Sequence, residues 1–223
     1  GVTAFNDMYF FPGAAGEAAL AAGMRAALGM IVVDFPSPYA SDPIDYLAKG
    51  LALRDSMREQ PLLSFCFAPH APYSVSDKAL IQVATYANEL EVPVHIHLHE
   101  TRDEVTQGIS RDGRRPLARL QDLGLVGPNL LAVHAVHLEG NEIDVLARHA
   151  SHVAHCPSSN LKLASGLCPV AALQRAGVNV ALGTDGAASN NRLDMWSELQ
   201  TAALVGKLAA SDATALPPAQ VLA

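Results

Sequence analysis

Short runs of β-branched and apolar residues recur along the whole chain, and most of them are separated by segments with helical periodicity. The runs that predict strands lie at residues 1–7, 29–35, 62–70, 92–100, 129–138, 151–157 and 178–186. Helical periodicity is clearest at 16–29, "GEAALAAGMRAALG", and at 77–90, "DKALIQVATYANEL". Alternation of this kind predicts an α/β fold with a parallel sheet. Because the strand runs are almost continuously apolar, we expect both faces of the sheet to be covered.

Seven strand–helix units favour a TIM-type (β/α)8 barrel that lacks one strand. The chain opens inside a strand pattern without a starting Met, and it closes about one turn into a helix at 215–223, "ALPPAQVLA". We therefore expect an internal piece of a longer protein, with residues 1–223 forming one barrel domain truncated at both ends. Strands 2 to 8 of the barrel would be present. A doubly wound open sheet is the competing architecture, but no G-x-G-x-x-G follows a strand.

Polar side chains cluster where the predicted strands end, and this favours the barrel. In β/α barrels the active site is built from the carboxyl ends of the strands. The residues concerned are Asn6, Asp7, Asp34, His70, His97 to Glu100, His134, His155 and Thr184 to Gly186.

The densest of these clusters is "HIHLHET", residues 95–101. Side chains alternate along a strand, so His95, His97 and His99 are predicted to share one face. A lone histidine in such a run is usually a packed core residue, whereas three in alternation favour a metal site. The following residues change to a polar, helix-like pattern, and a turn near Glu100 could bring that carboxylate beside His97.

Three further residues are candidates for the same site. His134 ends "LLAVH", and as the next strand end of a barrel it would neighbour His97. Asp185 ends "VNVALGTD" and is either a helix cap or a ligand; the next clear helix begins near Asp194, which weakens the cap interpretation for Asp185. His70 lies in the proline-flanked loop "APHAPYS", which suits either substrate contact or an ordinary loop histidine.

Composition excludes several classes of protein. The formal net charge is −7, so the electrostatic footprint of a nucleic-acid binder is missing. No apolar run reaches the roughly 18 residues that span a membrane. The cysteines, Cys66, Cys156 and Cys168, form no C-x-x-C pair and no disulfide framework, so we expect a reducing, cytoplasmic setting.

Imidazole nitrogens and a carboxylate around an open position can hold a divalent ion. Such an ion lowers the pKa of bound water to about 7. His97 and Asp185 are two candidate metal ligands, and Asp185 could also accept the proton of the water. A catalytic zinc site typically has three protein ligands, so we expect the others on the absent strand. Zinc is the first choice for this one ion, with iron as the alternative, since the ligand set suits several divalent metals.

The sequence resembles the amidohydrolase superfamily over essentially its whole length. The resemblance rests on "TAFNDMYFFP", "APHAPYS", "HIHLHET", "HAVHL", "HCPSSNLKLASG" and "GTDGAASNNRLDMW", which occur in this order. Within the superfamily it is similar to the 5-methylthioadenosine/S-adenosylhomocysteine deaminases, which group with the triazine chlorohydrolases. The fold implied is a metal-dependent hydrolase barrel, here without its first strand, whose His-x-His pair has no counterpart, and without the flanking β-sandwich.

The resemblance also implies a role for each candidate. His97 looks like a metal ligand, and Asp185 like a metal ligand and general base that also meets substrate. Glu100 looks like the glutamate that moves protons to the substrate, and His134 like a catalytic histidine that holds the attacking water or the substrate. His70 resembles a substrate-binding histidine.

The reaction implied is hydrolytic deamination of an adenine-type nucleoside, 5'-methylthioadenosine or S-adenosylhomocysteine, with release of ammonia. The alternatives are a guanine deaminase or a triazine chlorohydrolase or aminohydrolase, and, as a different class, a non-catalytic degenerate barrel. The expected partner is a small purine nucleoside, with no nucleic acid and no membrane. The oligomeric state stays open, with a homo-oligomer as one option.

Overall fold

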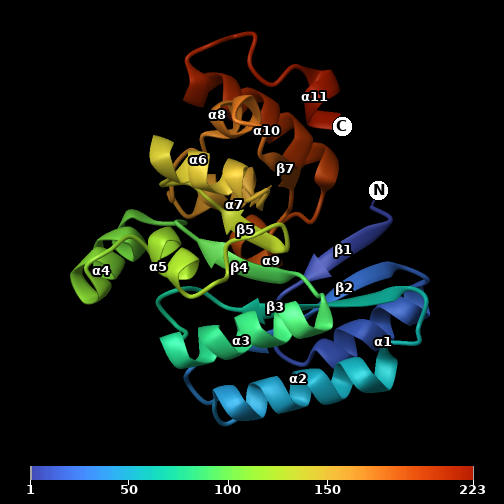
Figure 1. Cartoon of the computed structure of the whole chain (residues 1–223). Helices are drawn as coiled ribbons and strands as arrows, with labels where there is room; N and C mark the ends of the chain where they lie inside the picture. Colours follow the sequence, from blue (N-terminus) through green and yellow to red (C-terminus); the bar gives the residue numbers. More distant parts are fainter. Residues whose placement is uncertain (1, 223) are drawn as a thin grey trace. The chain divides into compact units, whose positions relative to one another are not determined.

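The computed structural model describes residues 2–222, in which strands and helices follow one another along the chain (Figure 1). The strands are β1 (Ala4–Asp7), β2 (Arg25–Val32), β3 (Leu63–Pro69), β4 (Val94–Leu98), β5 (Leu130–His134), β6 (His152–His155) and β7 (Asn179–Leu182). The helices are α1 (Pro12–Ala22), α2 (Pro43–Met57), α3 (Asp77–Leu90), α4 (Arg102–Asp112), α5 (Pro116–Asp122), α6 (Gly140–Arg148), α7 (Pro157–Lys162), α8 (Val170–Arg175), α9 (Ala187–Asn190), α10 (Met195–Ala210) and α11 (Pro218–Leu222). Six of the predicted strand segments contain a strand in full, whereas the segment at 29–35 covers only the second half of β2, which begins four residues earlier, at Arg25.

Contacts within the chain group it into two units. The N-terminal unit comprises Val2–Ile96 and Leu120–Leu125, and the C-terminal unit comprises His97–Arg119 and the chain from Val126 onward. The boundary falls inside β4, between Ile96 and His97.

Within each unit the strands pair in parallel and in chain order. In the N-terminal unit β1 pairs with β2, β2 with β3, and Phe67 of β3 with Val94 of β4. In the C-terminal unit β5 pairs with β6, and β6 with β7. Parallel neighbours joined by helices in chain order are the topology of a β/α barrel, which confirms the predicted fold class.

The packing of β2 explains its composition. Gly29 lies between β1 and β3, where an added Cβ would come within 2.4 Å of the Asp7 carbonyl oxygen and 2.8 Å of the Ala68 Cβ. Helices α1 and α2 pack on this strand, and α3 packs on β3 (Figure 1). On α2, Gly50 brings the helix backbone down onto Met30 of β2, because a Cβ there would lie 2.8 Å from the Met30 Cβ.

The predicted helix at 16–29 is partly wrong. Helix α1 ends at Ala22, Gly23 caps it with a left-handed φ of 66°, and β2 has begun by Arg25. The alanine-rich sequence continues across this boundary and keeps its helical periodicity, but pairing with β1 and β3 places residues 25–29 in the sheet.

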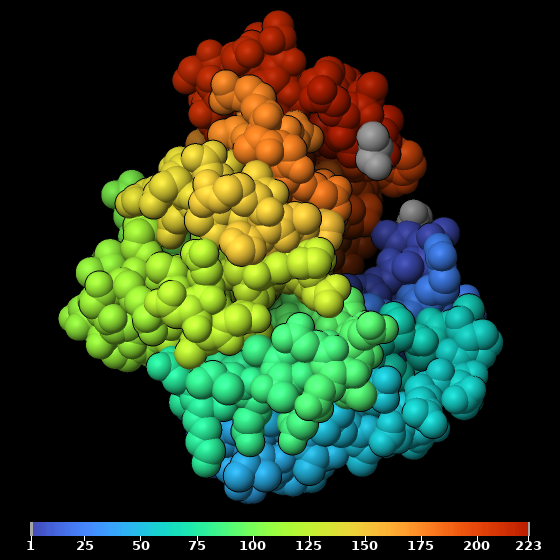
Figure 2. Space-filling view, in the orientation of Figure 1, coloured from blue at the N-terminus to red at the C-terminus, as the bar shows by residue number. Residues whose placement is uncertain are grey.

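In the C-terminal unit α10 packs against α7, α8 and α11, and the residues of α10 and α11 fall in the red end of the colour scale of Figure 2. Helix α10 begins directly after Asp194, where the sequence predicts a helix start, and the Asp194 carboxylate caps it by accepting a hydrogen bond from the Trp196 amide. Among the helices described, none combines the length and apolar character that crossing a bilayer requires.

Candidate functional site

The three histidines of "HIHLHET" have three different environments, so the prediction that they share one face is wrong for His99. His95 lies in the N-terminal unit, where its Nδ1 donates to Asn6 Oδ1 at 2.9 Å. His97 is half-buried in the C-terminal unit and stacks on His134, with ring centroids 5.4 Å apart. His99 follows the end of β4 and adopts a left-handed φ of 53°, which breaks the alternation of the strand.

The His99 ring is a fully buried structural group. Its Nε2 accepts a hydrogen bond from the Leu117 amide at 3.1 Å, so its Nδ1 carries the proton and faces Glu142 Oε2 at 3.5 Å. Burial, and then the positive charge of Arg115, lower the pKa of His99 to about 3. His99 is therefore neutral and supports the strand end.

The turn predicted near Glu100 is present. The His99 backbone turns the chain, and the Glu100 carboxylate reaches His134, with Oε2 at 3.9 Å from His134 Nε2. Glu100 remains partly exposed, its side chain retaining 19% of its accessible surface, whereas the His134 side chain retains 2%. A partly exposed carboxylate beside a buried imidazole can exchange protons with a bound molecule.

The His134 ring is fixed by a hydrogen bond on its Nδ1 side, away from the Nε2 atom that lies near Glu100. Its Nδ1 lies 2.8 Å from Asn160 Oδ1, and Asn160 has no exposed surface. An amide oxygen only accepts, so Nδ1 donates, and in the neutral ring Nε2 presents its lone pair on the side of Glu100. This orientation suits a histidine that holds a water or substrate group.

Asp185 is held as an anion. Its Oδ2 accepts hydrogen bonds from the hydroxyls of Ser159 at 2.6 Å and Ser189 at 2.7 Å, and its Oδ1 accepts from the Gly186 amide at 2.7 Å. Burial alone would raise the pKa of Asp185, but these bonds and the charge of His134 outweigh it, and the pKa is lowered. The Gly186 and Ser189 bonds resemble a local cap for α9, whereas the Ser159 bond comes from another element.

Two residues that the sequence did not single out support the site from α7. Ser159 and Asn160 are adjacent and fully buried, and they bond to Asp185 and His134 respectively. Residues 157–162 of "HCPSSNLKLASG" form a helix that begins with proline. The only sequence signal was a polar Ser-Asn pair directly after a predicted strand.

A buried glutamate on α10 supports the same region. Glu198 has no exposed surface, and it accepts hydrogen bonds from Asn190 Nδ2 at 2.7 Å and from the Ser158 amide at 3.2 Å. The Asn190 side chain also donates to the Thr184 carbonyl oxygen at 2.6 Å. Glu198 thereby links α7 to the segment that carries Asp185.

His70 lies in the N-terminal unit, after β3. Its Nδ1 is 2.8 Å from the Ser74 hydroxyl oxygen, and its ring meets Tyr73 edge-on with centroids 5.8 Å apart. The His70 amide donates to the Val32 carbonyl oxygen at 3.0 Å, which fixes the loop to the end of β2. The loop is thus held in place, as its flanking prolines predict.

The candidate metal ligands fit a metal only as part of a larger set. Across residues 2–222 no three His, Cys, Asp or Glu side chains are grouped so that they could hold an ion. His97 offers an imidazole, and Asp185 offers a carboxylate kept ionised, which are donors that zinc and related ions accept. A site built on this pair needs at least one further ligand.

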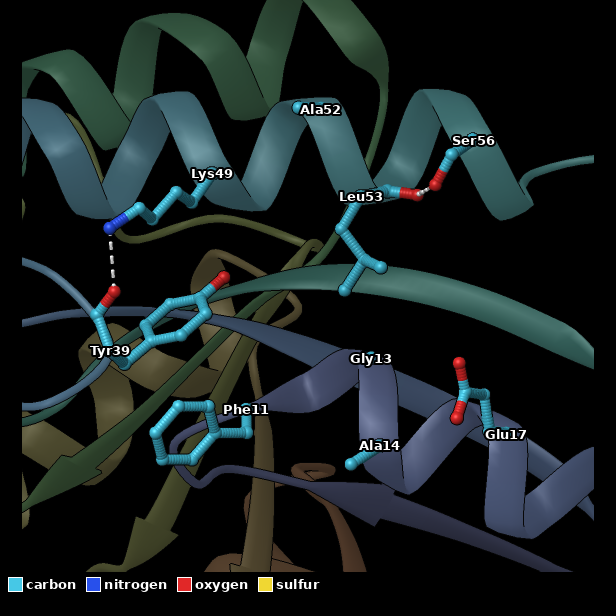
Figure 3. Close-up of a pocket in the computed structure, with 9 residues that line it drawn as sticks. All are labelled: Phe11, Gly13, Ala14, Glu17, Tyr39, Lys49, Ala52, Leu53 and Ser56. Atoms are coloured by element: carbon cyan, nitrogen blue, oxygen red, sulfur yellow. Dashed lines mark hydrogen bonds between the residues drawn. The ribbon is translucent and has the colours of Figure 1, made fainter.

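A surface hollow of the N-terminal unit is lined by none of these side chains. It has a volume of about 590 Å³ and lies between α1 and α2, where Lys49 donates to the Tyr39 carbonyl oxygen at 2.7 Å (Figure 3). Its lining consists of Phe11, Gly13, Ala14, Glu17, Tyr39, Lys49, Ala52, Leu53 and Ser56. No predicted catalytic residue lines it, so its chemistry is separate from that of the candidate site.

Known proteins share both the sequence and the fold. A 5-methylthioadenosine/S-adenosylhomocysteine deaminase from Teredinibacter turnerae is 55% identical over 216 residues, covering 97% of this chain and 49% of the relative. A crystal structure of an adenosine deaminase from Xanthomonas campestris with bound zinc has a TM-score of 0.98 and 50% identity, covering 100% of this chain and 51% of that one. The zinc complex of atrazine chlorohydrolase from Arthrobacter aurescens has a TM-score of 0.90 at 23% identity, covering 100% of this chain and 54% of that one, and it shows likeness of fold alone.

These comparisons agree on the family and on how much of the known proteins the chain covers. The chain spans about half the length of the curated relatives that it matches. The sequence profile of the Amidohydrolase family matches residues 1–223. The chain belongs to the amidohydrolase family.

Proposed function

We propose that the full-length protein carrying this chain is a metal-dependent hydrolytic deaminase that releases ammonia from 5'-methylthioadenosine, S-adenosylhomocysteine or both. The observation that carries the proposal is the group formed by His97, Glu100, His134 and Asp185 in one unit. Curated relatives 40–55% identical to the chain bear the name of this activity. Residues 1–223 would form part of one catalytic barrel domain.

Each side chain has a role that its surroundings support. Glu100 is partly exposed beside His134, so it can accept a proton from water and deliver it to a ring nitrogen of the purine. His134, oriented by Asn160, holds the attacking water or the substrate through Nε2. Asp185, kept ionised by its hydroxyl donors, serves as the base and, with Glu100, contacts the substrate. The family resemblance also gives His70 a substrate-binding role.

The cofactor in this proposal is one divalent metal ion, zinc by preference and iron as the alternative, with His97 and Asp185 among its ligands. When bound, such an ion lowers the pKa of a coordinated water to about 7 and so supplies a nucleophile at neutral pH. His97 is kept in place by its stacking on His134. The assignment of a small nucleoside as partner, without nucleic acid, and of a cytoplasmic location belongs to the same proposal.

Ammonia release by the purified full-length protein tests the substrate. We expect release from methylthioadenosine or adenosylhomocysteine, no ammonia from guanine and no chloride from a chlorotriazine. Glu100→Gln should lower kcat by about 10²- to 10⁴-fold, the usual contribution of a general acid or base. A wild-type protein that releases no ammonia from either nucleoside contradicts the proposal, and release from guanine would favour the related alternative.

Metal content tests the ligand assignment independently of turnover. His97→Ala should lose most of the bound metal in elemental analysis of the full-length protein. His95→Ala is the matched control, since this histidine lies two residues earlier on the same strand and bonds to Asn6 instead. Equal metal content in wild type and His97→Ala would rule out His97 as a ligand.

A further inference from the structure

Glu104 is a buried carboxylate that binds the backbone just before the helix on which it sits. It is 5% exposed and lies in the first turn of α4. Its Oε1 accepts from the His99 amide at 2.8 Å, and its Oε2 accepts from the Glu100 amide at 2.8 Å. The Glu104 amide in turn donates to the Thr101 hydroxyl oxygen at 3.1 Å. One side chain thus holds two consecutive amides at the end of β4.

These contacts differ from an ordinary capping box. In that motif the acidic residue three positions after the N-cap reaches back to the N-cap amide. Helix α6 shows it within this chain, where Glu142 accepts from the amide of its N-cap residue Glu139 at 2.8 Å. In α4 the N-cap is Thr101, but the Glu104 carboxylate bonds to the two amides before it. Its bonds therefore stabilise the turn that leads into the helix.

The turn held in this way sets the direction of Glu100. His99 has a φ of 53°, a conformation that non-glycine residues rarely adopt and that persists where its surroundings impose it. The His99 carbonyl oxygen accepts from the Val136 and His137 amides at 3.1 and 3.0 Å, so the peptide is held from both sides. With the Glu100 amide fixed, its carboxylate is placed 3.9 Å from His134.

We propose that Glu104 is a positioning residue that aims Glu100 at the reacting molecule by binding the amides of His99 and Glu100. The inference rests on the proposed function, because the role of Glu100 as proton carrier is part of it. A cap that served only the helix would stabilise the fold equally whether or not Glu100 is present. A positioning residue loses its effect on turnover once the carboxylate that it aims has been altered.

A double-mutant cycle on the full-length protein separates these cases. Glu104→Gln keeps the size of the side chain but replaces one acceptor with a donor that faces an amide. We expect kcat to fall at least tenfold, with KM and metal content within twofold of wild type. In a Glu100→Asp background, which retains a shorter carboxylate, the same substitution should change kcat less than twofold. Asp103→Asn, an exposed acid in the same helical turn, is the matched control and should leave kcat unchanged.

Equal losses of kcat in both backgrounds overturn the inference, and so does an unchanged kcat in Glu104→Gln. If Glu104→Gln fails to fold, Thr101→Ala can be used instead. It removes the acceptor of the Glu104 amide and so weakens the hold of Glu104 on the His99 and Glu100 amides. It should lower kcat by a smaller factor, again only where Glu100 is intact. A loss that persists in the Glu100→Asp background overturns the inference here too.

Hydrogen exchange gives a readout that does not depend on turnover. The amides of His99 and Glu100 should exchange at least tenfold faster in Glu104→Gln than in wild type, while those of Asp103→Asn keep the wild-type rate. Unchanged exchange in Glu104→Gln would show that the Glu104 side chain does not hold these two amides. A wild-type protein without deaminase activity, but with faster exchange in the variant, removes the proposed function and leaves Glu104 as the residue that holds this turn.

Discussion

At the scale of single residues, the site is marked by backbone conformations that non-glycine residues rarely adopt. His99, His134, Ala135 and Asp185 all have positive φ values, of 53°, 73°, 48° and 58°, at the ends of β4, β5 and β7. Such conformations persist where neighbouring groups impose them, and they concentrate at functional sites. Here each of the three strand ends turns a titratable side chain out of the regular alternation of its strand.

The hydroxyl of Ser159 is expected to matter for turnover, since it provides the 2.6 Å bond to Asp185. A hydrogen bond to a charged group contributes about 1.5–3 kcal/mol, so Ser159→Ala should lower kcat/KM for the nucleoside about tenfold or more. Ser158→Ala, which keeps the backbone amide that bonds to Glu198, is the control and should stay within twofold of wild type. Equal activity in both variants would show that Ser159 does not assist Asp185.

At the scale of elements, polar bonds join the loops that follow the strands to the helices that come next. Arg115, just before α5, donates two parallel bonds to Glu142 of α6 at 2.9 and 2.8 Å, together with one to the His137 carbonyl oxygen at 2.5 Å. Glu142 is the capping-box residue of α6, and its side chain is only 7% exposed. Arg115 therefore ties the start of α6 and the segment after β5 to the residues just before α5.

Removing one partner of this pair is expected to destabilise the fold, because it leaves a buried charge without compensation. Arg115→Met should lower the free energy of unfolding by about 3 kcal/mol, measured by urea denaturation of the full-length protein. Arg111→Met breaks the more exposed contact with Asp112 and should cost about 1 kcal/mol or less. Equal losses in the two variants would show that burial of Glu142 is not what makes the pair important.

At the scale of the whole molecule, buried histidines connect stability to pH. His155 ends β6, is 1% exposed, and its Nδ1 has no hydrogen-bond partner in the part of the chain that the structure describes. Burial, followed by the charge of His134, lowers the pKa of His155 to about 4. The unfolded chain therefore takes up the proton first, near pH 6.5.

This difference predicts how stability responds to acid. Because the folded pKa is depressed, the contribution of His155 is complete above pH 6.5 and is lost as the pH falls towards 4, by at most about 3 kcal/mol. Burial raises the pKa of Glu104 to about 7, so Glu104 makes the protein more stable as the pH falls from about 7 to 4.5, opposite to His155. The effect of His155 is therefore measured as the difference between wild type and a His155 variant. In urea unfolding at pH 7 and pH 4, His155→Gln should lose less stability than wild type. Parallel losses would contradict the assigned pKa.

Much of the fold could be predicted because its signals are local. The apolar runs contain six strands of the described residues in full and the second half of β2, and the periodic segment at 77–90 coincides with α3. The alanine-rich segment at 16–29 was misassigned after Ala22, since its residues suit a helix by themselves and only pairing with β1 and β3 makes part of it a strand. Tertiary contacts there override helix propensity.

The sequence by itself determined the family, the order of strands and helices, and the polar residues that end the strands, because apolar periodicity and motif order are properties of neighbouring residues. Only the tertiary structure decided that Glu100 turns towards His134, that His99 turns away from the alternation of β4, and that α7 supports both His134 and Asp185. Those outcomes depend on hydrogen bonds such as Asn160 to His134 and Ser159 to Asp185, each made between residues 26 positions apart. The direction of a side chain beyond a strand end follows from its backbone dihedral angles and its distant partners, which no local pattern encodes.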